Sequence, residues 1–280
     1  MKFYPAGEVI VHRLLDLPLQ HMEWIVTGAE AGEMVAAGFH RHAADETCFV
    51  HAESGDVYQL ARRQYLDRKT GRLKYRCDAG VTLEDELATR PLTILAMASD
   101  AEDIVDPFDG QEDLVAGVLR HVTPFYRYRP QYLLLTAVWA ARLRPWGFRV
   151  AHSTFRLMKK MVAGGAIGQL PRQTLSDTVL EAVSSPRPSE FFRVLQTCDA
   201  LPSISSELAD LFEKSQSNHM DKDIPSVLRV LDEAAAETAN VSSIIKIFYD
   251  LLAEDADSIF EALGLKSLRQ GAAGKIDNAD

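Results

Sequence analysis

Charge divides this sequence into three blocks. Residues 114–176 contain ten Arg and Lys and not one Asp or Glu, although the whole chain carries 40 acidic against 30 basic residues. The flanking blocks, 1–113 and 177–280, carry 11 basic against 21 acidic residues and 9 against 19. A net charge of −10 argues against a polyanionic partner. The segregation argues for one, because a local basic surface attracts polyanions whatever the net charge.

Aromatic rings are interleaved with these cations, among them Tyr126, Trp139 and Trp146. Cations that contact phosphates, together with flat rings that stack on bases, are typical of RNA-binding surfaces. The alternative is that Tyr132 and Trp139 belong to a hydrophobic core and that acidic neighbours balance the cations. The predicted RNA-binding residues are Arg120, Arg127, Arg129, Arg142, Arg149, Arg156, Lys159 and Lys160.

Length and composition indicate an ordinary globular protein. A chain of 280 residues that is 47% hydrophobic can form two domains with a sizeable core. Cys48, Cys77 and Cys198 are odd in number and lack metal-ligand spacing, which indicates a reduced, intracellular protein. No apolar run reaches the ~18 residues of a membrane span, and no signal peptide is visible. We therefore expect a cytoplasmic protein without a membrane partner.

The hydrophobic pattern predicts an α+β fold, with a small sheet and few helices followed by an all-α part. We expect a head domain (1–113), a basic helical neck (114–200), an acidic helical body (201–268) and a flexible tail (269–280). Strands are predicted at 23–27, 39–42, 47–51 and 57–61, then a polar loop over 62–78; 92–98 and 104–108 would complete one sheet. Helices are predicted at 9–15, 33–37, 83–89, 130–143, 149–162, 173–183, 189–198, 205–214, 224–239, 241–252 and 255–263, with caps from Thr82, Asp223 and Asn240.

Three stretches are distinctive: Val81-Thr-Leu-Glu-Asp, Asp106-Pro-Phe-Asp-Gly110 and Leu143-Arg-Pro-Trp-Gly-Phe-Arg-Val-Ala-His. They resemble stretches of the bacterial CCA-adding enzymes, the tRNA nucleotidyltransferases whose class includes bacterial poly(A) polymerases. The resemblance runs in register over residues 1–201. It implies a nucleotidyltransferase-type α/β head followed by an all-α neck and body.

The motifs that carry the family's chemistry are altered at the matching positions. The phosphate-binding Gly-Gly-x-x-Arg-Asp falls on residues 7–12, where Gly7 remains but Glu8 replaces the second glycine and Val11 the arginine. The metal-binding Asp-x-Asp falls on His21-Met22-Glu23. Mg²⁺ prefers hard carboxylate oxygens, so this pair is a poor substitute.

Three further motifs are altered as well. Arg-Arg-Asp keeps only Arg90, Glu-Asp-x-x-Arg falls on residues 128–132, and Glu-Arg-x-x-x-Glu falls on residues 172–177. The resemblance therefore implies vestigial catalytic positions at His21 and Glu23, and vestigial nucleotide-binding positions at Gly7 and Arg90. It implies no intact catalytic residue and no metal site.

Three functions remain open at this stage. The first is a non-catalytic relative that binds tRNA or another structured RNA and needs no cofactor. The second is a protein-interaction role for the acidic helical body, in which the apolar face of helix 241–252 is partly exposed. The third is a residual ATP- or CTP-dependent nucleotidyltransferase that binds Mg²⁺ through Glu23 and either Asp45 or Asp56.

Overall fold

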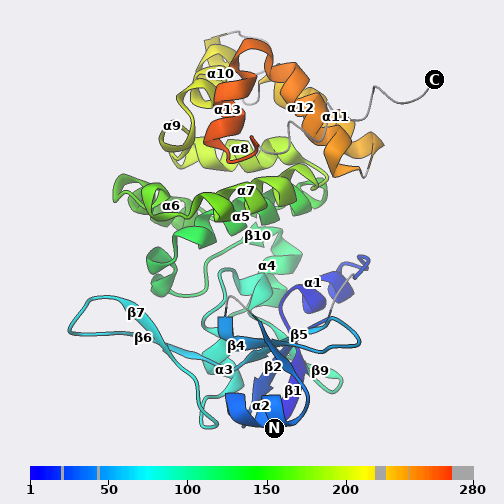
Figure 1. Cartoon of the computed structure of the whole chain (residues 1–280), viewed down its shortest axis with the longest axis vertical. Helices are drawn as coiled ribbons and strands as arrows, with labels where there is room; N and C mark the ends of the chain where they lie inside the picture. The colour runs from blue at the N-terminus through cyan, green and yellow to red at the C-terminus, as the bar shows by residue number, and fades with distance from the viewer. Residues whose placement is uncertain (20–21, 43–44, 218–224, 239, 267–280) are drawn as a thin grey trace. The chain divides into compact units, whose positions relative to one another are not determined.

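The computed structural model describes residues 1–19, 22–42, 45–217, 225–238 and 240–266. The chain forms two compact units, Met1–Tyr128 and Arg129–Asp280 (Figure 1). The first unit contains sheets and short helices and the second is mainly helical, which confirms the α+β fold class. No helix in the described part of the chain is long and apolar enough to cross a membrane. Cys48, Cys77 and Cys198 are free thiols.

A mixed five-stranded sheet forms the centre of the first unit. Its strand order is β1-β2-β5-β4-β3; β2 runs parallel to β5 and the other neighbours are antiparallel. Strands β2, β3, β4 and β5 confirm those predicted from the sequence, whereas β1 was not predicted. Their bounds are β1 (Lys2–Pro5), β2 (Glu23–Thr27), β3 (His40–His42), β4 (Asp45–Val50) and β5 (Val57–Leu60), and the nearby helices are α1 (Glu8–Leu14), α2 (Ala31–Ala36) and α3 (Leu83–Leu87).

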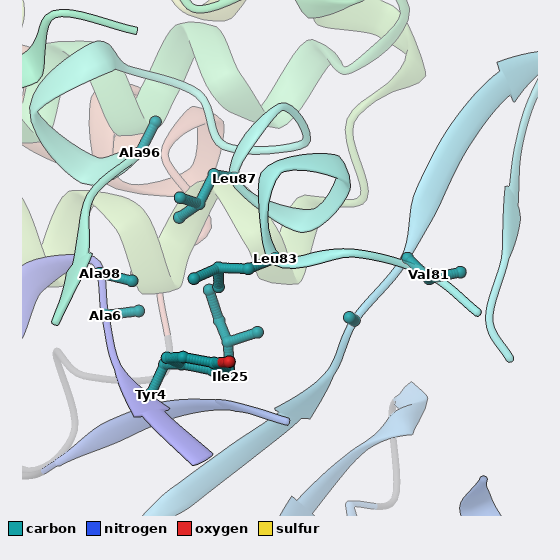
Figure 2. Packing of buried hydrophobic residues seen from close by; sticks show 9 residues of the cluster. Tyr4, Ala6, Ile25, Val81, Leu83, Leu87, Ala96 and Ala98 are labelled. Carbon is teal, nitrogen blue, oxygen red and sulfur yellow. The ribbon is translucent and has the colours of Figure 1, made fainter. Parts of the chain in front are cut away.

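Strand β2 is covered by apolar side chains on both faces of the sheet. Ile25 of β2 packs against Leu83 and Leu87 of α3 (Figure 2), whereas its neighbour Val26 lies in a second cluster with Met34 of α2. Successive strand residues point to opposite faces, so the adjacent pair Ile25-Val26 requires apolar cover on both. The expected cap of α3 is confirmed, since Thr82 Oγ1 accepts a hydrogen bond from the backbone N–H of Asp85 at 3.2 Å.

The prediction of a polar loop over residues 62–78 is wrong. The structure has an antiparallel hairpin there, formed by β6 (Arg63–Leu66) and β7 (Leu73–Arg76). The turn is built by Asp67, whose Oδ1 accepts the backbone N–H of Lys69 at 2.8 Å, and by Gly71 in the left-handed region at φ +65°. The alternation of apolar and polar residues that predicts a strand is weak here, because a hairpin that is exposed on one face needs few apolar residues.

Residues 92–98 and 104–108 were predicted to complete the main sheet, and this prediction is wrong. Instead, residues 92–108 form the 3₁₀ turn η1 (Thr93–Leu95) and a separate hairpin of β8 (Ala98–Asp100) and β9 (Asp103–Val105). The unit continues with α4 (Gly110–Ala116), β10 (Val118–Leu119) and η2 (Pro124–Tyr128). The backbone N–H of Thr93 donates to the carbonyl of Arg120 at 2.9 Å. The first compact unit therefore extends into the basic block, and the three-domain division at residues 113 and 200 stays a prediction.

Helices dominate the second unit. Helix α5 (Pro130–Leu143) lies at the predicted residues and packs against α7 (Arg172–Val183) and α8 (Pro188–Thr197). The remaining elements are η3 (Arg144–Trp146), β11 (Arg149–Val150), α6 (His152–Ala163), η4 (Ile167–Gln169), α9 (Leu201–Ile204), α10 (Ser206–Ser217), α11 (Ser226–Glu237), α12 (Val241–Leu252), η5 (Ala253–Asp255) and α13 (Ala256–Ala262).

Helix α12 is capped as predicted, since Asn240 Oδ1 accepts the backbone N–H of Ser243 at 3.2 Å. Most of its apolar face is buried, through Ile244, Ile245, Phe248 and Leu252, while Leu251 is half-buried. The exposed apolar face that the protein-interaction hypothesis requires is therefore largely covered. The ring of Phe248 is fully buried and lies 5.6 Å from Phe192 and 5.7 Å from Phe260, centre to centre. The predicted cap Asp223 and the tail lie outside the described residues.

Candidate functional site

A buried carboxylate organises a cluster of charged side chains in the first unit. Helix α3 places Glu86 where its side chain is 0% exposed. Arg62 donates to both carboxylate oxygens, from Nη2 at 2.9 Å and from Nε at 3.1 Å, and its backbone N–H adds a third bond at 2.8 Å. This two-pronged geometry is the strongest form of the Arg–carboxylate contact. Burial alone would lower the pKa of Arg62, but the Glu86 charge raises it above its ordinary value.

Arg90 connects this cluster to the position of the altered metal motif. Its Nη1 donates to Glu23 Oε1, and its Nη2 lies 3.5 Å from Glu86 Oε1. Burial lowers the pKa of Arg90, and the charges of Glu23 and Glu86 raise it to a net value above the ordinary one. Neither Arg62 nor Glu86 falls in a family motif. The sequence does contain one signal for Glu86: it lies four residues before Arg90, a spacing that lets oppositely charged side chains meet.

Three of the four vestigial positions meet at one place. Gly7 has a left-handed φ of +64°, and a Cβ added there would lie 2.7 Å from Glu23 Oε2 and 3.6 Å from Arg90 Nη1. The backbone conformation therefore favours glycine at position 7, and a side chain there would displace the Glu23 carboxylate. The fourth position, His21, lies outside the described residues.

The donor set here does not fit the Mg²⁺ ion that the family's reaction implies. Glu23 is ion-paired with Arg90, and the Asp45 carboxylate accepts from Thr47 and from Arg62 at 3.2 Å. Asp56 Oδ1 accepts the backbone N–H of Met22 at 3.2 Å. The described residues hold no group of three His, Cys, Asp or Glu side chains able to bind a metal. The carboxylates proposed for a residual site are thus engaged by other partners.

Some of the predicted RNA-binding residues have partners within the protein. Arg120 pairs with Asp113 through two nitrogens, at 2.9 Å each, and Arg142 pairs with Glu181 at 2.6 Å. Lys159 lies 3.4 Å from Asp199. The guanidinium groups of Arg127 and Arg142 also lie over the rings of Tyr128 and Trp139, at 4.9 and 5.1 Å, and Arg129 is half-buried just before α5.

Other predicted residues form an exposed basic stripe, in which Lys159 is the member with an acidic partner, Asp199. Lys159 and Lys160 lie about one helical turn after Arg156 on the exposed side of α6, while Met158 and Met161 are buried on its other side. Arg149 is exposed shortly before this helix. Within the described chain, no carboxylate pairs with Arg149, Arg156 or Lys160. We call Arg149, Arg156, Lys159 and Lys160 the basic face.

The aromatic rings divide into core and surface. Trp139 is 4% exposed, Phe148 2% and Tyr126 2%, so these rings stabilise the fold. Trp146 is 46% exposed and follows directly after α5, in the same short segment as Arg149. Of the predicted base-stacking rings, Trp146 is thus the exposed one, and it lies three residues before Arg149 of the basic face in sequence.

Comparison of the sequence with known proteins finds close relatives. No family model matches the chain. It is 36% identical over 236 residues to the multifunctional CCA protein of Ectopseudomonas mendocina, which covers 82% of this chain and 57% of that protein. It is 38% identical over 215 residues to the CCA-adding enzyme of Pseudomonas putida, covering 75% and 58%. The chain thus spans a little under three fifths of the length of these curated relatives.

Solved structures have the same fold. A Bacillus stearothermophilus CCA-adding enzyme in complex with CTP matches with a TM-score of 0.72 and 15% identity, over 97% of this chain and 64% of that one. A Thermotoga maritima CCA-adding enzyme complexed with tRNA_CCA matches with a TM-score of 0.60 and 18% identity, over 96% and 64%. The fold is therefore that of the tRNA nucleotidyltransferases. With the sequence relationship added, the chain is a homologue of the bacterial CCA-adding enzymes.

Proposed function

We propose that this protein binds RNA of the tRNA type through its basic face and does not add nucleotides to it. The observation that carries the non-catalytic part is the ion pair between Glu23 and Arg90. The relatives are named for CCA addition, and one fold neighbour is a complex with tRNA. These names support the choice of tRNA as the RNA to be tested.

The chemistry of nucleotidyl transfer supports the loss of activity. Two-metal catalysis needs anionic oxygens that are free to coordinate both ions. The only carboxylate left in the metal motif is Glu23, which Arg90 already neutralises. Val11, which replaces the phosphate-binding arginine, is fully buried and apolar. Glu8 adds a negative charge where a triphosphate would approach.

The electrostatics support RNA binding. Arg149, Arg156 and Lys160 form no ion pair with a carboxylate of the described chain. A phosphate that binds them therefore displaces only water and counterions and breaks no ion pair of the protein. Each phosphate contact by such a cation releases counterions and contributes about 0.7–0.9 to the salt slope of binding. The exposed ring of Trp146 offers a flat face on which a base can stack.

The protein-interaction alternative would be favoured by an exposed apolar patch on α12, and the burial of Ile244, Ile245, Phe248 and Leu252 argues against such a patch. The residual nucleotidyltransferase requires Glu23 to leave Arg90. It is retained as an outcome of the activity measurement described at the end of the Discussion.

Reversing the charge of the basic face tests the binding surface. The variant Arg149→Glu, Arg156→Glu, Lys159→Glu and Lys160→Glu should abolish binding of a fluorescent tRNA that lacks its CCA end, measured at about 50 mM and about 200 mM salt. The wild-type protein should bind tightly, with affinity falling steeply as salt rises. Circular dichroism should stay unchanged, because exposed substitutions typically shift stability by less than about 0.5 kcal/mol each.

A matched control makes the same change in net charge elsewhere in the helical unit. It carries four reversals, at Arg187, Lys214, Lys246 and Lys266, which are all exposed. This control should bind tRNA nearly as well as the wild type. If the two variants bind equally well, the basic face is not the RNA-binding surface.

A further inference from the structure

The β6–β7 hairpin concentrates positive charge outside the basic block. Residues 62–76 hold seven of the eleven basic residues of the segment 1–113, with Asp67 as their single acid. The rest of that segment carries four basic against twenty acidic residues. An acidic domain thus presents one strongly basic arm. Such segregation marks a surface for a polyanion, because scattered charges would create no local field.

The strand register places cations on a common face. Arg63 pairs with Arg76 and Tyr65 with Lys74 across the hairpin, and strand residues two apart share a face. All four side chains are exposed, and the Tyr65 ring is 44% exposed. The cations of this face make surface ion pairs, which contribute little in water and can be exchanged for phosphates.

The tip of the hairpin adds cations without acidic partners. Arg68, Lys69 and Arg72 are exposed, and no carboxylate of the described chain pairs with them. The nearby Asp67 is engaged within the turn: its carboxylate pairs with Lys74 and accepts the backbone N–H of Lys69. These contacts, first the hydrogen bond from Lys74, lower the pKa of Asp67 to about 2. The acid therefore shapes the turn and leaves the tip cations unneutralised.

The base of the hairpin is anchored. Arg62 is held by Glu86, and Gln64 Nε2 donates to the carbonyl oxygen of Ala88 just after α3. Figure 1 shows β6 and β7 extending as a two-stranded arm away from the five-stranded sheet. A firm base with an exposed tip can present the cations to a ligand outside the domain.

We propose that the β6–β7 hairpin is a second RNA contact, in which Arg68, Lys69 and Arg72 bind phosphates and Tyr65 offers a ring to a base. The proposal rests on the proposed function and extends it to the first unit. RNA fits this surface better than a protein does. Protein interfaces are depleted of charge at their centre, and here the exposed apolar side chains are few and surrounded by cations.

Removal of the tip charges tests this contact. The variant Arg68→Gln, Lys69→Gln and Arg72→Gln should bind the fluorescent CCA-lacking tRNA about tenfold or more weakly at about 50 mM salt, and its salt slope should fall by about 2. The control variant Lys2→Gln, Arg13→Gln and Arg41→Gln removes three exposed cations of the same unit. It should keep the wild-type slope.

The outcomes separate the two proposals. If wild-type protein binds tRNA and the tip variant has the control's affinity and slope, the hairpin contact is overturned while RNA binding by the basic face stands. If the wild type binds no tRNA at either salt concentration, both proposals fail. Loss of the slope in the control as well would mean that net charge alone sets binding, and that also overturns the hairpin contact.

Discussion

At the scale of single residues, the positions of the family motifs meet although their side chains have changed. In the structure, Gly7 and Glu23 lie together with Arg90. The resemblance could not predict the ion pair between Glu23 and Arg90, because a motif match aligns positions in sequence and does not show which side chains touch. Glu86 was also missed. A glutamate on a short helix is usually solvated, and its burial depends on Arg62, which is distant in sequence.

Glu86 should be the most sensitive residue of this cluster. Glu86→Gln keeps the side chain's shape but leaves Arg62 and Arg90 without their shared buried charge. Breaking a buried ion pair in this way typically costs about 3–5 kcal/mol. The free energy of unfolding, measured in urea, should fall by that amount. Glu84→Gln, at an exposed position on the same helix, should change it by less than about 0.5 kcal/mol. Equal effects of the two substitutions would contradict the stabilising role of the cluster.

At the scale of elements, the periodicity predicted most helices and four of the five strands of the main sheet, and it missed β1. It missed the β6–β7 hairpin because a basic arm exposed to water lacks the apolar alternation of a half-buried strand. For α12 it predicted the apolar stripe but not its burial. An apolar stripe in the sequence shows which side chains favour burial. It does not show what buries them; in the structure Phe192 and Phe260 pack against Phe248 of this stripe.

The cap of α12 offers a test at this scale. Asn240→Ala removes the side chain that accepts the backbone N–H of Ser243 and should lower the unfolding free energy by about 1 kcal/mol. Ser242→Ala, at an exposed position in the first turn, serves as the control and should have little effect. Denaturant unfolding followed by circular dichroism measures both. A cap variant as stable as the control would mean that packing alone fixes the start of α12.

At the scale of the whole molecule, the charge pattern and the compact units follow different boundaries. The sequence predicted the fold class and the segregation of charge. It did not predict that the first unit extends through Tyr128, because residues 114–128 are basic at their surface but are bonded to the core of that unit. Two basic surfaces, on α6 and on the hairpin, thus lie in different units. A non-catalytic RNA-binding protein is the function that agrees with both surfaces and with the altered metal motif.

The most direct test incubates the protein with labelled tRNA lacking its CCA end, together with CTP, ATP and Mg²⁺. Each reaction is divided between a native and a denaturing gel. The account predicts a shifted complex on the native gel and an RNA of unchanged length on the denaturing gel. Lengthening of the RNA by even one nucleotide would contradict the loss of catalysis, and absence of the shifted complex would contradict RNA binding.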